Sequence, residues 1–142
     1  METITRKKIT VETTINAPVA SVWELWTSPA HITQWNNASD DWHSPRAEND
    51  LRPGGRFLAR MEAKDGSFGF DFTGTYLDVK PNQYLEYTID DGRKVEVFFT
   101  PLGNQTRVVE TFEAEEVNSI EMQQGGWQAI MDNFKKYAEK NN

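Results

Sequence analysis

An apolar stripe near the C-terminus limits this chain to architectures that bury one long helix along one side. Within the segment 118–137 and just beyond it, apolar side chains recur at the spacing of a single helix face, at Trp127, Ile130, Met131, Phe134 and Ala138. Asn118 followed by Glu121 is typical of an N-terminal cap with its reciprocal partner, so we expect the helix to begin there. A face this broad has to pack against another apolar surface.

A pattern of alternating residues between Gly55 and Glu113 predicts that second surface. Apolar residues occupy every second position there, and short turns interrupt the pattern at Lys64–Gly66, Pro81–Asn82, Asp90–Gly92 and Leu102–Asn104. Alternation with tight turns between the runs is typical of consecutive antiparallel strands. We therefore expect a meander of five strands in this region.

The N-terminal part adds one more strand and two short helices. Lys8–Ile15 alternates apolar and polar residues, and Pro18 suits the first position of a following helix. Ser28-Pro29 then begins a second helical turn. Together these elements predict an α+β fold. A curved antiparallel six-stranded sheet wraps around the long C-terminal helix, and two short helices follow the first strand. Such a sheet leaves a space between its concave face and the helix.

The segment Asn36–Pro53 shows neither a helical nor a strand period. It follows Trp35 and carries Trp42 and His43. A long irregular segment inside a compact domain is more often a lid or a binding loop than a simple connector. We expect it to gate the space between the sheet and the helix.

The charge balance and composition exclude several classes of partner and chemistry. The formal net charge is −7 and the pI is near 4.8, which argues against binding to nucleic acid or to an anionic membrane surface. Cysteine is absent, so disulfides, cysteine metal sites and thiol nucleophiles are excluded. Met1–Thr10 is polar and carries no secretory signal, and no segment reaches the roughly 18 apolar residues of a membrane span. We expect a single domain, residues 1–142, located in the cytoplasm.

The sequence contains no recognisable catalytic or cofactor motif. There is no Gly-x-Ser-x-Gly and no visible Ser–His–acid grouping. Gly54-Gly55 precedes a strand and lacks the lysine that a phosphate-binding loop requires. Four candidate metal ligands have no recognised ligand spacing and fit a solvated acidic loop better: His31, His43, Asp40 and Asp41. We therefore expect no cofactor and no metal, and the sequence leaves open whether any reaction is catalysed.

Aromatic residues are frequent, with five Trp, eight Phe and four Tyr in 142 residues. Side chains of this size either interdigitate into a solid core or line a cavity. We expect a cavity between the sheet and the last helix, and we expect its walls to include Trp35, Trp42, Phe57, Met61, Phe70, Phe72, Tyr87, Phe99, Glu110, Phe112, Trp127, Ile130 and Phe134.

Glu110 is the candidate polar group of that cavity. It lies between Val108 and Phe112 on one strand face, so an inward-facing register places a carboxyl group among apolar side chains. Burial raises the pKa of a carboxyl group, which makes Glu110 a candidate acid, base or ligand anchor. The alternatives are a structural ion pair with Arg56 or Arg60 and a register in which Glu110 faces solvent.

Motifs spread along the chain resemble one known family. They are the run 16–26 (Asn-Ala-Pro-Val-Ala-Ser-Val-Trp-Glu-Leu-Trp), Ser28-Pro29, Trp35, the run 51–57 (Leu-Arg-Pro-Gly-Gly-Arg-Phe), Gly74-Thr75-Tyr76 and Gly126-Trp127. Together they resemble the START-like helix-grip superfamily (SRPBCC), and within it the proteins similar to the activator of heat-shock protein 90 ATPase. The resemblance covers about Ile9 to Tyr137 and implies the helix-grip fold.

The resemblance implies more than one function, since the superfamily includes lipid carriers, cyclases and co-chaperone domains. Our leading hypothesis is that a small, largely apolar molecule binds in the cavity. The first alternative is an enzyme of the cyclase, hydrolase or isomerase kind that uses Glu110, alone or with His43, as its acid/base group. The second is a co-chaperone-like module that binds a protein through an exposed apolar patch, although the chain carries only the domain resembling the co-chaperone's C-terminal part. A homodimer is compatible with each hypothesis.

Overall fold

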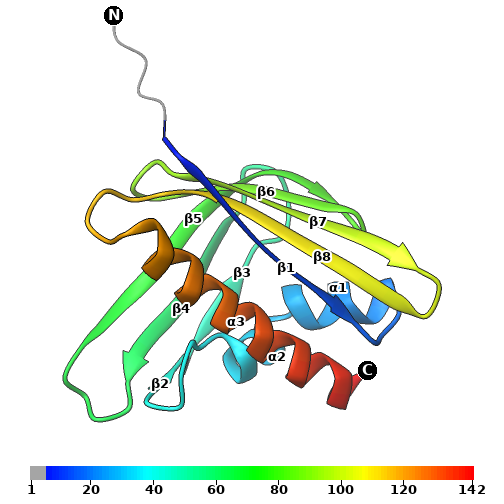
Figure 1. Cartoon of the computed structure of the whole chain (residues 1–142), viewed down its shortest axis with the longest axis horizontal. Coiled ribbons are helices and arrows are strands. Elements are labelled where there is room, and N and C mark those ends of the chain that lie inside the picture. The colour runs from blue at the N-terminus through cyan, green and yellow to red at the C-terminus, as the bar shows by residue number, and fades with distance from the viewer. Residues whose placement is uncertain (1–5) are drawn as a thin grey trace, which may run out of the picture.

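A curved antiparallel sheet grips a long C-terminal helix in the computed structural model, which describes residues 6–142 (Figure 1). Within these residues the helices are α1 (Val19–Thr27), α2 (Pro29–Trp35) and α3 (Ile120–Asn141). The strands are β1 (Lys8–Ile15), β2 (Trp42–His43), β3 (Ala47–Asn49), β4 (Arg56–Ala63), β5 (Gly69–Lys80), β6 (Tyr84–Ile89), β7 (Lys94–Leu102) and β8 (Gln105–Glu113). The α+β class and the helix-grip arrangement are confirmed. The first half of the polar segment Met1–Thr10 lies outside the described residues.

The described strands form one sheet in the order β1-β8-β7-β6-β5-β4-β2, with β3 also paired to β4. Neighbouring strands pair antiparallel throughout, so the meander from β4 to β8 is the expected one. The sheet has eight strands and not six, because the segment 36–53 contributes β2 and β3. Runs of two or three residues are too short to show a period, which is why the sequence predicted an irregular segment there.

Helix α3 is capped by Ser119 and not by Asn118, one residue later than predicted. The Ser119 hydroxyl accepts a hydrogen bond from the Met122 amide at 3.1 Å. The backbone of Asn118 has other partners: its amide donates to the Glu115 carboxylate at 2.6 Å, and its carbonyl accepts from the Gln123 side chain at 2.8 Å. Serine and asparagine cap helices about equally well, so these surrounding bonds decide which of the two takes the position.

The other helix ends differ little from the predictions. Pro18 is the N-cap of α1 and not its first helical residue, with an extended backbone at φ −69° and ψ 154°. α2 begins at Pro29, as expected, and α3 continues past Tyr137 to Asn141. Of the helices in residues 6–142, none combines the length and the apolarity that crossing a membrane requires.

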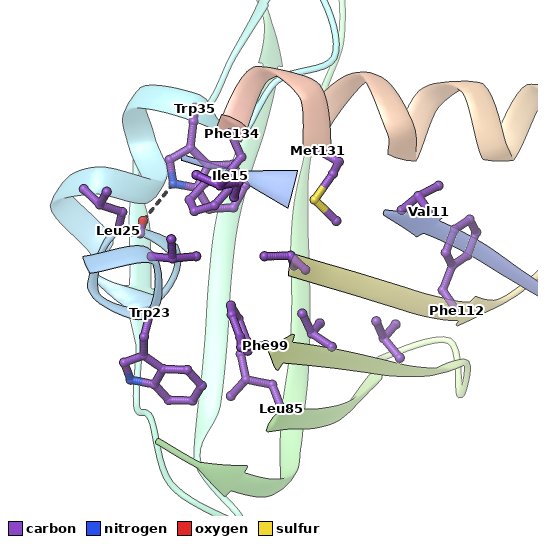
Figure 2. Close-up of a cluster of buried hydrophobic side chains, with 14 of the residues drawn as sticks. Val11, Ile15, Trp23, Leu25, Trp35, Leu85, Phe99, Phe112, Met131 and Phe134 are labelled. Atoms are coloured by element: carbon purple, nitrogen blue, oxygen red, sulfur yellow. Dashed lines mark hydrogen bonds between the residues drawn. The ribbon is translucent and has the colours of Figure 1, made fainter. Parts of the chain in front are cut away.

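A packed aromatic core lies beneath the C-terminal half of α3 (Figure 2). Phe134 has no exposed surface, and its ring centroid lies 4.8 Å from those of both Trp26 and Trp35. The Trp35 indole N–H donates to the Leu25 carbonyl at 2.9 Å, which fixes the orientation of that ring. Trp26 also meets Phe99 edge-on at 5.8 Å. Because Trp26 belongs to α1 and Trp35 to α2, the two short helices fill this end of the space inside the sheet.

Two backbone features of β5 shape the other end. The pairing of β5 with β6 shifts register between Tyr76 and Asp78, and a bulge of this kind increases the local bend of a sheet. Gly74 lies directly against Phe57: a Cβ at position 74 would come within 2.6 Å of the ring and 2.3 Å of the Thr88 carbonyl oxygen. A larger residue would displace the ring, so this glycine allows Phe57 to pack close to the strand.

Candidate functional site

A pocket of about 420 Å³ lies between the sheet and the N-terminal half of α3. Strands β3, β4, β5, β6 and β8 supply one side of it and α3 supplies the other, while α1 and α2 close one end. Small-molecule sites in proteins usually have a volume of several hundred Å³ and mostly apolar walls. The walls and the polar groups of this pocket therefore determine what it can hold.

Aromatic rings form much of the pocket wall. Phe57 is at the centre of the strand side, with ring-centroid distances of 4.9 Å to Tyr87, 5.3 Å to Tyr76 and 5.9 Å to Phe72. Trp127 faces them from α3, with its ring 6.4 Å from that of Phe72. Trp127 is held by stacking on Phe112 at 3.8 Å, with the two ring planes 10° apart. The wall is thus rigid and offers ring faces and edges to a ligand.

Glu110 brings a carboxyl group into this aromatic chamber from β8. It is 6% exposed, lines the pocket, and forms no hydrogen bond or ion pair with any of the residues 6–142. Burial among apolar groups disfavours the charged form and raises the pKa of Glu110 to about 8. An empty pocket therefore holds a carboxyl group that is largely protonated at neutral pH and has an unused capacity to donate or accept a hydrogen bond.

Two tyrosine hydroxyls add to the polar groups near Glu110. Tyr76 donates to the side-chain oxygen of Asn49 at 2.7 Å, and Asn49 in turn donates to the Thr27 carbonyl at 2.6 Å, which ties β3 to α1. Burial raises the pKa of Tyr87 well above its ordinary value, and the neighbouring Glu110 and Tyr76 raise it further. Both phenols therefore stay protonated, and Tyr76, Tyr87 and Glu110 all line the pocket as its polar groups.

The mouth of the pocket lies between the β4–β5 hairpin and the start of α3. Phe70 and Met122 line the pocket and are still 42% and 65% exposed. Phe68 continues this surface, and Trp42 packs on both phenylalanines at ring-centroid distances of 6.0 Å and 6.2 Å. Apolar side chains thus surround the opening as well as the interior.

Most residues predicted to surround a cavity line this pocket: Trp35, Phe57, Met61, Phe70, Phe72, Tyr87, Glu110, Trp127 and Ile130. Three other predicted residues do not line the pocket but lie in the packed core between the sheet and α3, each 3% exposed or less: Phe99, Phe112 and Phe134. Trp42 of β2 lies outside the lining and packs against Phe68 and Phe70 of the β4–β5 hairpin. Strand parity identifies the inner face of the sheet, but it does not tell which part of that face a helix covers.

The arginines considered as partners of Glu110 are engaged elsewhere. Arg56 forms a two-pronged pair with Asp90 at 2.7 Å and 2.8 Å. Arg60 pairs with Glu62 at 2.8 Å. The structural ion pair predicted as one alternative for Glu110 is therefore wrong, and so is the register that would turn Glu110 toward solvent.

The two histidines lie apart from the pocket and from each other. The Nε2 of His43 is 3.6 Å from the Glu62 carboxylate, and His43 does not line the pocket. The Nδ1 of His31 lies 2.6 Å from the Tyr137 hydroxyl. Within residues 6–142, no three His, Asp or Glu side chains, including the aspartates at 40–41, gather closely enough to hold a metal ion.

Three residues of α3 that were not predicted to line the pocket do so: Met122, Gln123 and Gly126. Gly126 lines the pocket and Gly125 lies on the exposed side next to it, and a Cβ at either position would meet nothing within 4 Å. Gln123 is 7% exposed, and its side chain bonds both the amide and the carbonyl of Glu115, which ties the preceding segment to the helix. Consecutive glycines inside a helical pattern destabilise the helix, and this signal was available in the sequence.

These features together define a class of protein. A curved antiparallel sheet holds a long C-terminal helix, and the two enclose a pocket between them, which is the arrangement of a helix-grip protein. The chain belongs to the family described as Activator of Hsp90 ATPase homolog 1-like protein, whose model matches residues 16–139. The family resemblance stated from the sequence motifs is thereby confirmed. Among curated proteins, none matches this chain.

Solved structures with the same architecture come from several bacteria. The solution structure of the AHSA1-like protein from Aeromonas hydrophila is 47% identical, with a TM-score of 0.89, and covers 94% of this chain and 93% of its own. The protein Chr148 from Cytophaga hutchinsonii is 54% identical, with a TM-score of 0.82 and the same coverage of 94% and 93%. The protein NE0264 from Nitrosomonas europaea is 18% identical at a TM-score of 0.80, with 94% of each chain covered, and this likeness shows the fold alone.

Proposed function

We propose that this protein binds a small, largely apolar molecule in the pocket under α3. The observation that carries the proposal is about 420 Å³ of space walled by the rings of Phe57, Phe72 and Trp127. Unfilled space of this kind is unfavourable, because the side chains around it lose packing contacts that a filled core would provide. A ligand of matching shape restores those contacts, and the stacked wall is already in place to receive it.

We propose that the ligand passes between Phe70 and Met122, which are exposed at the mouth. The segment 36–53, which the sequence suggested as a gate, is attached at several points: β2 and β3 pair with β4, and Asn49 bonds both Thr27 and Tyr76. Access through that segment would break these bonds, whereas access at the mouth breaks none of them.

A matched pair of glycine variants tests the proposal with the neutral dye Nile red, whose fluorescence increases in apolar surroundings. Gly126→Leu adds a side chain inside the pocket, while Gly125→Leu adds the same side chain on the exposed side of the same helix. We expect the affinity for Nile red to fall about tenfold or more in the first variant, a loss of about 1.4 kcal/mol, and to be unchanged in the second. Equal affinities in the two variants would contradict the proposal.

Native mass spectrometry of the freshly purified protein addresses the identity of the ligand. We expect an adduct that dissociates on denaturation and that has the size of a molecule fitting about 420 Å³. The adduct should be lost from Gly126→Leu and kept by Gly125→Leu. An adduct that both variants retain would belong to another part of the molecule.

The alternatives have less support in the geometry. The predicted enzyme would use Glu110, alone or with His43, as its acid/base group; His43 of β2 lies beside Glu62 of β4 and outside the pocket, so Glu110 would have to act without it. The co-chaperone alternative shares its name with the family description and predicts an exposed apolar patch. The exposed apolar side chains Phe68, Phe70 and Met122 surround the mouth of the pocket, where the ligand proposal accounts for them equally well. Homodimer formation, the cytoplasmic location and the exclusion of nucleic acid and membranes stay predictions from the sequence.

A further inference from the structure

Carboxylates dominate the charged groups that line the pocket. Glu110 lies inside, and Glu48 and Glu115 line the pocket as well. Arg93 is the one basic side chain in the described lining, and it is already paired with Asp91 at 2.8 Å. Even with Glu110 protonated, Glu48 and Glu115 outnumber Arg93, so a molecule in the pocket encounters a negative potential.

Glu110 is a buried carboxyl group without a protein partner. It is 6% exposed, and within residues 6–142 nothing donates a hydrogen bond to it. A buried carboxylate is stable only when a cation or several donors accompany it. The surrounding strands and α3 provide neither, so Glu110 stays protonated in the empty pocket, and a cation brought by a ligand would stabilise its ionised form.

The rings that line the pocket together with Glu110 are suited to the same kind of ligand. Tyr87, Phe72 and Trp127 present aromatic surface to the pocket, and the negative face of an aromatic ring attracts a cation. The remaining wall is aliphatic or aromatic and accommodates an uncharged body. The pocket thus combines one anionic position with a large apolar volume.

We propose that the ligand carries one protonated amine on an apolar body and that this ammonium group pairs with the Glu110 carboxylate. The inference rests on the proposed function, since it requires that the pocket hold a ligand. The competing chemistry is a neutral Glu110 that donates its proton to a carbonyl or hydroxyl group. Glu48 and Glu115 favour the amine, because they attract a cation and have no comparable effect on a neutral molecule.

Three probes that share one apolar body test the charge preference: phenylbutylamine, phenylbutanol and phenylbutanoate. Their binding is measured by isothermal titration calorimetry at neutral pH and low salt. We expect the amine to bind at least about tenfold more tightly than the alcohol, because a charge-assisted hydrogen bond replaces a neutral one. We expect the carboxylate to bind most weakly, since it would meet like charges.

Substitution of Glu110 then assigns the preference to one residue. Glu110→Gln keeps the size of the side chain and removes its charge, and Glu24→Gln removes a charge from the exposed side of α1 as the matched control. We expect Glu110→Gln to lower the amine affinity about tenfold or more while changing the alcohol affinity by less than about twofold. Glu24→Gln should leave both affinities as they are. Thermal unfolding of each variant verifies that it is folded.

The outcomes separate this inference from the function on which it rests. If the three probes bind wild type with equal affinity, or if the amine preference survives in Glu110→Gln, the amine inference is wrong while the pocket still binds apolar molecules. Tighter binding of the alcohol would assign the neutral, proton-donating form of Glu110 instead. If neither these probes nor Nile red binds, the proposed function fails and the amine inference fails with it.

Discussion

The two halves of α3 cover the same sheet in different ways. In the C-terminal half, Met131, Phe134 and Ala138 are 1%, 0% and 0% exposed and belong to the packed core. In the N-terminal half, Met122 is 65% exposed and Gly126 has open space where a side chain would be. One helix therefore acts as a core element at one end and as a pocket wall at the other.

The difference arises from what the neighbouring elements insert under the helix. α1 and α2 lie beside the C-terminal half of α3 and supply Trp26 and Trp35, which fill the concave sheet there (Figure 1). Under the N-terminal half no such third layer is present among residues 6–142, and the helix contributes glycine where it could contribute bulk. The curved sheet makes the space, and the short helices decide how much of it is filled.

The largest expected effect is in the packed half. Phe134→Ala removes a ring that touches Trp26 and Trp35, and we expect it to lower the free energy of unfolding by about 3–5 kcal/mol. Phe72→Ala is the matched change in the pocket wall, with an expected loss of about 1–2 kcal/mol, because one side of that ring faces unfilled space. Urea denaturation measures both. Equal losses would contradict the division of α3 into two halves.

The next effect concerns Glu110, whose carboxyl group faces the pocket under the N-terminal half of α3. Burial raises the pKa of Glu110 from 4.5 to about 8, so the folded state binds this proton more tightly than the unfolded state. The resulting stability is complete below about pH 4.5 and is lost as the pH rises through about 8. We expect Glu110→Gln to match wild type near pH 4 and to exceed its free energy of unfolding by several kcal/mol at about pH 9.

Urea denaturation at a series of pH values checks this sign. The difference between Glu110→Gln and wild type should grow with pH, whereas Glu24→Gln should show no such trend. A difference that stays constant from acid to base would mean that Glu110 is not held in an apolar environment in the folded protein.

A smaller effect tests which residue caps the N-terminus of α3. Ser119→Ala removes the hydroxyl that accepts from the Met122 amide, and we expect a loss of about 1 kcal/mol in the free energy of unfolding. Asn118→Ala leaves the backbone bonds of that residue intact, so its loss should be smaller. Thermal or urea unfolding of the two variants compares the observed cap with the one expected from the sequence, and the reverse ranking would restore Asn118 as the cap.

The smallest effect is a gain in stability. Gly125→Ala and Gly126→Ala each replace a glycine inside a helix, and an added Cβ meets nothing at either position, so each should raise the free energy of unfolding by about 0.5–1 kcal/mol. Only Gly126→Ala projects into the pocket, so only this variant should also weaken the binding of Nile red slightly. A loss of stability at position 126 would show that this part of α3 is packed after all.

The long elements of the fold could be predicted because their patterns repeat several times. The apolar stripe on α3 and the alternation from β4 to β8 each extend over enough residues to distinguish the helical period from the strand period. β2 and β3 could not be predicted in this way, since two or three residues carry no period and their pairing with β4 depends on the path of the segment 36–53. Long-range pairing, and not local preference, makes them strands.

The sequence predicted which face of the sheet points inward, but it did not predict which part of that face borders the pocket. Tyr87 and Phe99 both point inward from neighbouring strands, yet Phe99 is covered by Trp23 and Trp26 of α1 while Tyr87 lines the pocket. The inward direction of Glu110 followed from its register, but its lack of a partner depended on where distant arginines extend. Periodicity along one strand contains no information about these contacts between elements.

The two short strands have a further consequence for the behaviour of the protein in concentrated solution. β4 would otherwise end the sheet as a long strand with unpaired backbone groups, and such an edge is a template for adding a strand from another molecule. Trp42–His43 and Ala47–Asn49 pair with it, and the Arg60 amide donates to the Arg46 carbonyl at 2.8 Å between them. The segment that was expected to gate a ligand thus protects the molecule against edge-to-edge aggregation.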